Sequence, residues 1–220
     1  MHPRTHTVPV VQRIVYDRGM GASDPIRRER KVKAHLAARA SILEAARRVA
    51  TRDGARNLSL RGVAAEAGFA PAALYSYFAN KDEILLALAA DDLSSLAKAM
   101  RAAASRNDAT SGLSAAIGAA LSQLEVMETM AAAAAALPAV PGTGESERHF
   151  NGRLIAALNA LSDARGRRAA ESRDVQCDVL LLAAALTGLA VLGRSGRLLA
   201  LGFTHDELLK RLEARFSATS

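Results

Sequence analysis

Histidines, paired acidic residues and a single cysteine supply residue types used in catalysis and metal binding, but their spacing assembles neither kind of site. His2 and His6 are four residues apart in a segment interrupted by prolines and glycines, and the other three histidines have no cysteine near them. Asp91 and Asp92 are adjacent, so on a helix they point to different faces. There is no nucleophile elbow and no phosphate-loop spacing. We therefore expect no catalytic residue, no metal, no cofactor and no enzyme activity.

The segment 59–78 has a different pattern, typical of binding to a long polyanion. It reads as two short helices, the first capped by Ser59 and ended by Gly68, which tolerates positive φ, and the second begun by Pro71. Packed on a helix over 33–53, the pair would form a three-helix unit with a helix-turn-helix, whose second short helix enters the major groove of DNA. The side chains expected to reach outward are those of Tyr75, Ser76 and Tyr77.

The charge is concentrated at the N-terminal end of the chain. Residues 1–56 hold 13 Lys and Arg against 5 Asp and Glu, whereas the whole 220-residue chain has a formal net charge of +7. Such asymmetry indicates a nucleic-acid-binding end on a neutral body, the alternative being a solvated basic tail. Lys81, at the start of a long helix, opposes the helix dipole and so favours a phosphate partner. The basic cluster consists of Arg27, Arg28, Arg30, Lys31 and Lys33.

Three stretches of residues carry a family resemblance. They are Ile42-Leu43-Glu44-Ala45-Ala46 with Gly54, then Ser59-Leu60-Arg61-Gly62-Val63-Ala64-Ala65-Glu66-Ala67-Gly68, then Leu74-Tyr75-Ser76-Tyr77-Phe78-Ala79-Asn80-Lys81-Asp82-Glu83-Ile84-Leu85. Together they resemble the N-terminal domain of TetR-family transcriptional regulators, over residues 36–90. The resemblance implies a homodimeric repressor that binds double-stranded operator DNA and is released by a small effector.

The resemblance also implies roles for individual residues. Phosphate contacts would come from Ser59, Arg61, Ser76, Tyr77 and Lys81, and base contacts from Ala72, Ala73 and Tyr75. Three positions depart from the family pattern. Ala70 stands where Ser or Thr often caps the recognition helix, Gly62 replaces a common acidic residue, and Ala50 replaces a common Phe. The alternative function is an all-α small-molecule-binding protein or enzyme on the same scaffold, without operator binding.

Composition and periodicity predict an all-α fold, because alanine is abundant and no strand pattern occurs. We expect an N-terminal three-helix helix-turn-helix domain and a C-terminal helical bundle for ligand binding and dimerisation. The expected boundaries are a disordered basic arm over 1–32, the DNA-binding domain over 33–90 and the effector and dimerisation domain over 91–220. Expected helices beyond the first domain span 110–136 and 171–192, among others.

The C-terminal part offers a candidate effector pocket and a candidate dimer interface. Leu121, Leu124, Met127, Phe150 and Leu154 would line an apolar pocket for a hydrophobic or amphipathic effector, or would form plain core. The dimer interface is expected at Leu182, Leu186, Leu189, Leu208 and Leu212, and Cys177 is expected in the core. The longest apolar run, 179–193, is shorter than the ~20 residues that span a bilayer, so we expect no membrane partner and a cytoplasmic protein.

Overall fold

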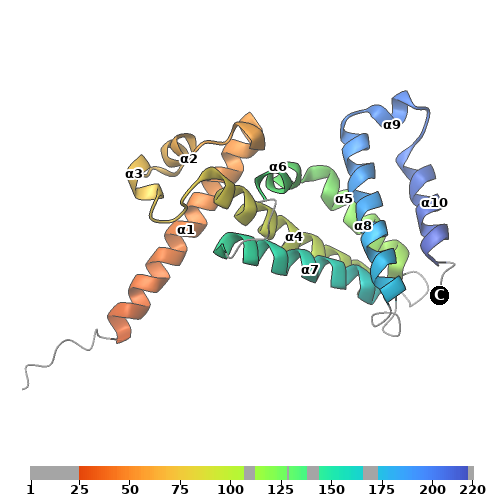
Figure 1. Ribbon diagram of the computed structural model, residues 1–220, viewed down its shortest axis with the longest axis horizontal. Helices are drawn as coiled ribbons and strands as arrows, with labels where there is room; N and C mark the ends of the chain where they lie inside the picture. Colours follow the sequence, from red (N-terminus) through yellow and green to blue (C-terminus); the bar gives the residue numbers. More distant parts are fainter. Residues whose placement is uncertain (1–24, 107–111, 128, 138–143, 166–172, 218–220) are drawn as a thin grey trace, which may run out of the picture. The chain divides into compact units, whose positions relative to one another are not determined.

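The computed structural model describes residues 25–106, 112–127, 129–137, 144–165 and 173–217, and every regular element in these ranges is a helix (Figure 1). The chain divides into two compact units, residues 1–38 and residues 39–220. The elements are α1 (Pro25–Asp53), the 3₁₀ turn η1 (Ala55–Asn57), α2 (Leu60–Ala67), α3 (Pro71–Leu74), α4 (Lys81–Ser105), α5 (Gly112–Val126), α6 (Thr129–Ala136), α7 (Glu145–Ala164), α8 (Arg173–Arg194), α9 (Arg197–Ala200) and α10 (His205–Ser217).

The first unit contributes the beginning of α1. Residues 1–24 of the expected disordered arm lie outside the described residues, but residues 25–32, expected in that arm, are helical and exposed. A proline is well suited to the first helical turn, and the Arg, Lys and Glu residues that follow are good helix formers. The basic cluster therefore lies along a helix rather than an irregular arm.

The second unit begins with a small core around the helix-turn-helix. Ile42, Ala46 and Ala50 of α1 pack with Val63, Leu74, Phe78 and Leu88, among others. The small side chain of Ala50, one of the departures from the family pattern, is buried in this core. The core therefore closes around an alanine where a bulkier aromatic residue is common.

A larger core is built around α4, which packs against α5, α6 and α7, while α8 covers α5 and α7. The segment expected as one helix over 110–136 is two helices, α5 and α6, and Met127 between them belongs to neither. Thr129 and Met127 are drawn inward at this break, where Thr129 donates a hydrogen bond to Asp92. The hydrogen bond to Asp92 of α4 holds the chain at this break, which the high helix propensity of the alanine-rich segment did not predict.

The helix α8 is apolar on nearly all sides, and the chain buries only part of it. Leu182 and Leu186 face the larger core, whereas Leu180, Leu181 and Val191 are exposed. Cys177 is also exposed, which corrects its expected place in the core. Among the described helices, α8 is the one long and apolar enough to cross a membrane by length and composition, since it has 22 residues rather than the shorter run counted in the sequence. The open face of α8 is named below by its exposed residues Cys177, Leu180, Leu181, Ala184, Thr187, Gly188, Val191 and Leu192.

Candidate DNA-binding surface and regulatory sites

The first short helix of the helix-turn-helix is fixed at both ends. Ser59 is extended, and its Oγ accepts a hydrogen bond from the backbone N–H of Gly62 at 3.1 Å, as an N-cap should. Gly68 ends the helix with φ of +71°, a left-handed conformation that favours glycine, and the next N–H, of Phe69, donates to Ala64 O at 2.9 Å. The tight turn expected from the sequence is confirmed.

The second short helix presents small side chains and one tyrosine to solvent. Ala72, Ala73 and Ser76 are exposed, and Tyr75 is 61% exposed, while Leu74 is fully buried and anchors the helix. Ala70 stands at the N-cap of this helix and has no side chain that could cap it, and Pro71 occupies the first turn. The N-terminal end of the helix therefore carries no hydroxyl. This surface can meet base edges only through methyl groups, one phenol and the hydroxyl oxygen of Ser76.

Two of the residues expected to contact phosphates through a hydroxyl, Ser76 and Tyr77, make different contacts within the chain. The Ser76 hydroxyl donates to Ala73 O at 2.7 Å, so its hydrogen is already used and it has none to offer a phosphate. The Tyr77 ring is half-buried and stands edge-on to Phe69, with 6.0 Å between ring centroids. These contacts fix the direction in which the second short helix faces.

The start of α4 offers a positive helix end beside a lysine. Asn80 Oδ1 accepts from Glu83 N at 3.0 Å, which caps the helix, and Glu83 Oε2 accepts at 2.8 Å from the N–H of Ala79, the residue before the cap. Lys81, the first helical residue, is exposed. An anion at this end would gain both from the lysine charge and from the helix dipole.

An arginine that the sequence analysis did not single out holds the unit together. The Arg39 guanidinium carbon lies 4.1 Å from the centroid of the buried Phe78 ring, within the range of a cation–π contact. Its position three residues before Ile42 carries no sequence signal of this role, because the ring is 39 residues away.

Other arginines of α1 are occupied by acidic partners. Arg48 and Arg52 both bind Glu66 of α2, at 2.8 and 3.0 Å, and Arg52 also binds Asp53 at 3.0 Å. Hydrogen bonds from Arg48 and Arg52 lower the pKa of Glu66, and the hydrogen bond from Arg52 lowers the pKa of Asp53. These arginines orient α2 on α1. Arg61 is exposed and without an ion pair or side-chain hydrogen bond among the described residues.

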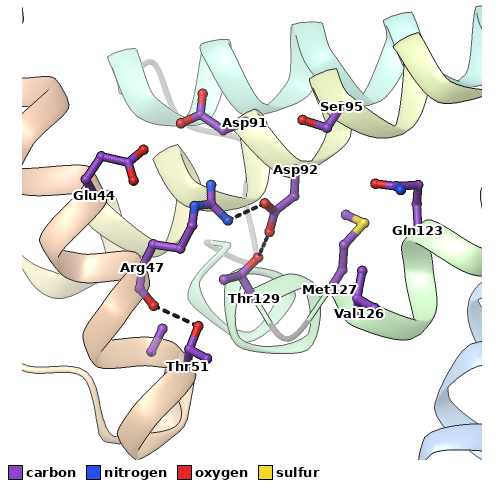
Figure 2. Close-up of a pocket in the computed structure, with 11 residues that line it drawn as sticks. Glu44, Arg47, Thr51, Asp91, Asp92, Ser95, Gln123, Val126, Met127 and Thr129 are labelled. Carbon is purple, nitrogen blue, oxygen red and sulfur yellow. Dashed lines mark hydrogen bonds and ion pairs between the residues drawn. The ribbon is translucent and has the colours of Figure 1, made fainter.

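A polar pocket of about 500 Å³ lies where α1, α4, α5 and α6 meet (Figure 2). In it, Arg47 Nη1 of α1 binds Asp92 Oδ1 of α4 at 2.5 Å, and Thr129 of α6 donates to the other oxygen of Asp92. Met127, expected in an apolar effector pocket, lines this polar pocket. One carboxylate therefore connects the helix that supports the DNA-binding unit to two helices of the larger core.

The break between α5 and α6 is also held from the C-terminal side. Arg194, at the end of α8, donates from Nη1 to Met127 O at 2.7 Å. His205 Nε2 of α10 lies 3.1 Å from Glu125 Oε1 of α5. Contacts from α4, α8 and α10 thus converge on Glu125, Met127 and Thr129.

A separate, apolar cavity of about 80 Å³ borders the larger core, and it is lined by Leu93 and Met100 of α4 among others. Of the residues expected in the effector pocket, Leu124 and Leu154 line this cavity, and Leu121 and Phe150 are packed in the core. The cavity has a single hydroxyl, that of Thr187, which donates to Ala183 O.

The expected dimer residues separate into two groups. Leu182 and Leu186 are buried in the core of their own chain, which corrects the expectation that they meet a second copy. Leu189, Leu208 and Leu212 are half-buried, and Leu189 and Leu212 pack against the larger core. Because α8 is apolar on nearly all sides, its sequence has no periodicity that distinguishes the face buried in its own chain from the exposed face. The expected interface residues Leu182 and Leu186 therefore fell on the buried face.

Comparison with known proteins bears on the N-terminal part and on the fold. Residues 42–88 match the family model described as bacterial regulatory proteins, tetR family. No curated relative matches the chain. A protein of unknown function from Rhodococcus sp. RHA1 has 25% identity and a TM-score of 0.63, with 82% of this chain and 94% of that chain covered.

Two further solved structures share the fold. A TetR-family transcriptional regulator from Streptomyces coelicolor has 21% identity and a TM-score of 0.58, with 83% of this chain and 99% of that one covered. The regulator FadR from Bacillus subtilis, in complex with stearoyl-CoA, has 19% identity and a TM-score of 0.56, with 82% and 98% covered. The family model falls on the helix-turn-helix described above, so residues 42–88 form a domain of the tetR family of bacterial regulatory proteins.

Proposed function

We propose that the protein is a dimeric, sequence-specific DNA-binding transcriptional repressor that a small hydrophobic or amphipathic ligand releases from its operator. The observation that carries this is the matched family domain over residues 42–88, in which a capped, hydrogen-bonded helix-turn-helix exposes Ala72, Ala73 and Tyr75. Arg61 and Lys81 supply exposed cations on the same domain. The site of action is then the cytoplasm, where operator DNA lies.

This surface must recognise a DNA sequence with few hydrogen bonds to the bases. The second short helix offers neither Arg, Lys, Asn nor Gln, the side chains that bind base edges through two hydrogen bonds. Specificity then comes from thymine methyl contacts, from DNA shape and from the basic cluster Arg27–Lys33 reaching an adjacent minor groove. Replacing the five basic residues of that cluster by glutamine should lower the ratio of operator to random-DNA affinity. An unchanged ratio in a competition titration would leave the cluster a purely electrostatic role.

Ligand release follows from the size and lining of the apolar cavity. About 80 Å³ is too small for a drug-sized or acyl ligand, so binding needs a wider cavity. Met100 and Met130 line it, and unbranched methionine side chains can rearrange to widen it. A ligand that fits only the widened state shifts the population toward that state.

The helix α4 connects that change to DNA. Its Leu93, Leu96 and Met100 line the cavity, its Asp92 binds Arg47 of α1, and its first residue is Lys81. A displacement of α4 therefore changes the position of the recognition helices in the dimer, which must be ~34–36 Å apart to enter successive major-groove turns.

Dimerisation is proposed through the open face of α8. A contiguous exposed face of leucine, valine and alanine on one 22-residue helix is larger than single exposed residues would explain. A second copy of the chain can cover it about a two-fold axis.

The test is a gel shift and fluorescence titration with promoter fragments from the DNA that neighbours the gene. We expect specific retardation, with log K falling by ~0.9 per log unit of salt for each phosphate neutralised. No retardation, or affinity independent of salt, would reject DNA binding and favour the small-molecule-binding or enzymatic alternative.

A further inference from the structure

The polar pocket of Figure 2 has the size of a site for a small molecule. Its volume of about 500 Å³ lies within the range of ~300–1,000 Å³ that is usual for ligand-binding clefts. Its lining residues all belong to the second unit and come from α1, α4, α5, α6 and the break between the last two. None of the described residues that line it also lines the apolar cavity of the larger core. The pocket is therefore a second concave site, separate from the one proposed for the hydrophobic ligand.

The charged side chains of this pocket have an excess of two negative charges. Glu44, Asp91 and Asp92 are acidic, and Arg47 is the single basic residue among the described residues that line the pocket. Arg47 binds Asp92 at 2.5 Å, so these two charges compensate each other. The uncompensated charges are those of Glu44 and Asp91.

These two carboxylates are exposed, and neither makes an ion pair or a side-chain hydrogen bond within the ranges that the structure describes. The two arginines one turn beyond Glu44, Arg47 and Arg48, are already bound to other acidic residues. Figure 2 shows Glu44 pointing from α1, and Asp91 from α4, toward the space between the two helices. A cation that balances both charges would have to come from another molecule.

The carboxylates of the pocket fit an organic cation better than a metal ion. In the described part of the chain, no three His, Cys, Asp or Glu side chains are grouped closely enough to hold a metal. Asp92, whose side chain is 11% exposed, instead holds the guanidinium of Arg47 and the hydroxyl of Thr129. A positively charged nitrogen with several N–H donors is thus the kind of group that this pocket already binds, from its own chain.

The other walls suit the uncharged part of such a ligand. The Ser95 hydroxyl and the Gln123 amide have no hydrogen-bond partner among the described residues, so both can bond to a polar group. Val126, which is 73% exposed, and Met127 add an apolar surface on which methylene groups can pack.

We propose that this pocket binds a small organic cation with two amino or guanidino groups, such as an aliphatic diamine. One charged group lies between Glu44 and Asp91, and the other competes with Arg47 for Asp92. The ligand therefore acts on the contact that joins α1 to α4. This inference goes beyond the proposed function, because it assigns a second ligand of different chemistry and does not depend on DNA binding.

Isothermal titration calorimetry without DNA tests the charge requirement. The probes are 1,4-diaminobutane, 1-aminobutane and 1,4-butanediol, which share a four-carbon chain and carry two, one and no positive charges at pH 7. We expect a Kd of about 1 mM or tighter for the diamine, about tenfold weaker binding of the monoamine, and no saturable binding of the diol. A monoamine or diol that binds as tightly as the diamine, or a diamine that does not bind saturably up to ~10 mM, would overturn the proposal.

Variants of the two free carboxylates test the location of the site. E44Q/D91N should weaken diamine binding about tenfold or more. The matched control E29Q/D163N removes one glutamate and one aspartate charge at exposed positions outside the pocket, so its net charge is the same, and it should bind the diamine as the wild type does. Unchanged affinity in E44Q/D91N would overturn the site. An equal loss in both variants would show attraction to the charge of the whole chain only, and would overturn it too.

Arg47 offers a variant in which binding should improve. R47Q removes the cation that competes with the ligand and leaves Asp92 without its ion pair, so diamine affinity should rise about tenfold. Damage to the fold does not tighten binding, and circular dichroism selects a temperature at which R47Q is folded. An affinity equal to that of the wild type, or lower, would overturn the competition with Arg47. No titration here contains DNA, so a failure of operator binding would leave these results unaffected.

Discussion

The helix-turn-helix region and the α8–α10 region use apolar residues in opposite ways. Around the helix-turn-helix, the large side chains Ile42, Leu74 and Phe78 are buried, and the exposed side chains are mainly polar or small. Along α8 and α9, exposed leucines alternate with buried ones, as at Leu181 and Leu182. The first region completes its core within one chain, whereas the second leaves an apolar face of the single chain exposed.

This difference indicates which substitutions affect folding and which affect assembly. A buried position in either region contributes to the stability of one chain, but an exposed apolar position of α8 contributes only when a partner covers it. Adjacent residues of one helix can therefore have unrelated effects.

The largest contrast is expected between neighbouring leucines of α8. L182R places a charge at a position that is 0% exposed, and we expect a loss of about 3 kcal/mol or more, seen as loss of the cooperative thermal transition. L181R, at a position 62% exposed, should keep the melting curve but give a monomer in sedimentation. Its operator affinity should fall by about 100-fold or more, because the second half-site is no longer linked. A dimeric L181R would contradict the assignment of the open face.

A smaller effect is expected where α8 meets α10. A Cβ at Gly193 would lie 2.0 Å from Nε2 of His205, so G193A must turn the imidazole away from Glu125. We expect a loss of about 1 kcal/mol in the free energy of unfolding, and no loss when the same change is made in H205A. G152A, in α7 with no atom within 4 Å of the added carbon, is the matched control and should stabilise by up to ~1 kcal/mol. Equal effects of G193A with and without His205 would contradict this contact.

Measurements of DNA affinity should distinguish the roles of Lys81 and Ser76 on the binding surface. K81A should reduce the salt slope by ~0.9 per chain, since each copy loses one phosphate contact. S76A should change operator affinity by less than about twofold, because its hydroxyl hydrogen already binds Ala73 O. The measurement is a fluorescence titration at several salt concentrations. A larger loss from S76A than from K81A would reverse the proposed roles.

The smallest effect concerns pH and the arginine–glutamate network of α1 and α2. The pKa of Glu66 is lowered by Arg48 and Arg52, so this carboxylate stabilises the fold above its ordinary pKa of 4.5. That contribution is lost as the pH falls through the lower pKa of the folded state. E66Q should therefore melt slightly below the wild type at pH 7, and the difference should shrink below pH 4.5. A difference that grows in acid would contradict the sign.

Much of the DNA-binding domain followed from local signals in the sequence. The cap at Ser59 and the turn at Gly68 each depend on residues within a few positions of one another. Hydrogen bonds and backbone conformations of that range are set by residue type, so spacing predicts them. The family match over 42–88 lies within the same stretch of local pattern.

The tertiary structure decided the features that depend on distant residues. The break between α5 and α6 depends on Asp92 and Arg194, and the contact of Arg39 with Phe78 joins two helices across 39 positions. The inner face of α8 could not be chosen from its sequence, since leucine and alanine occur on every side. Which apolar residues are buried depends on what packs against them, and only the assembled helices separate Leu182 from Leu181.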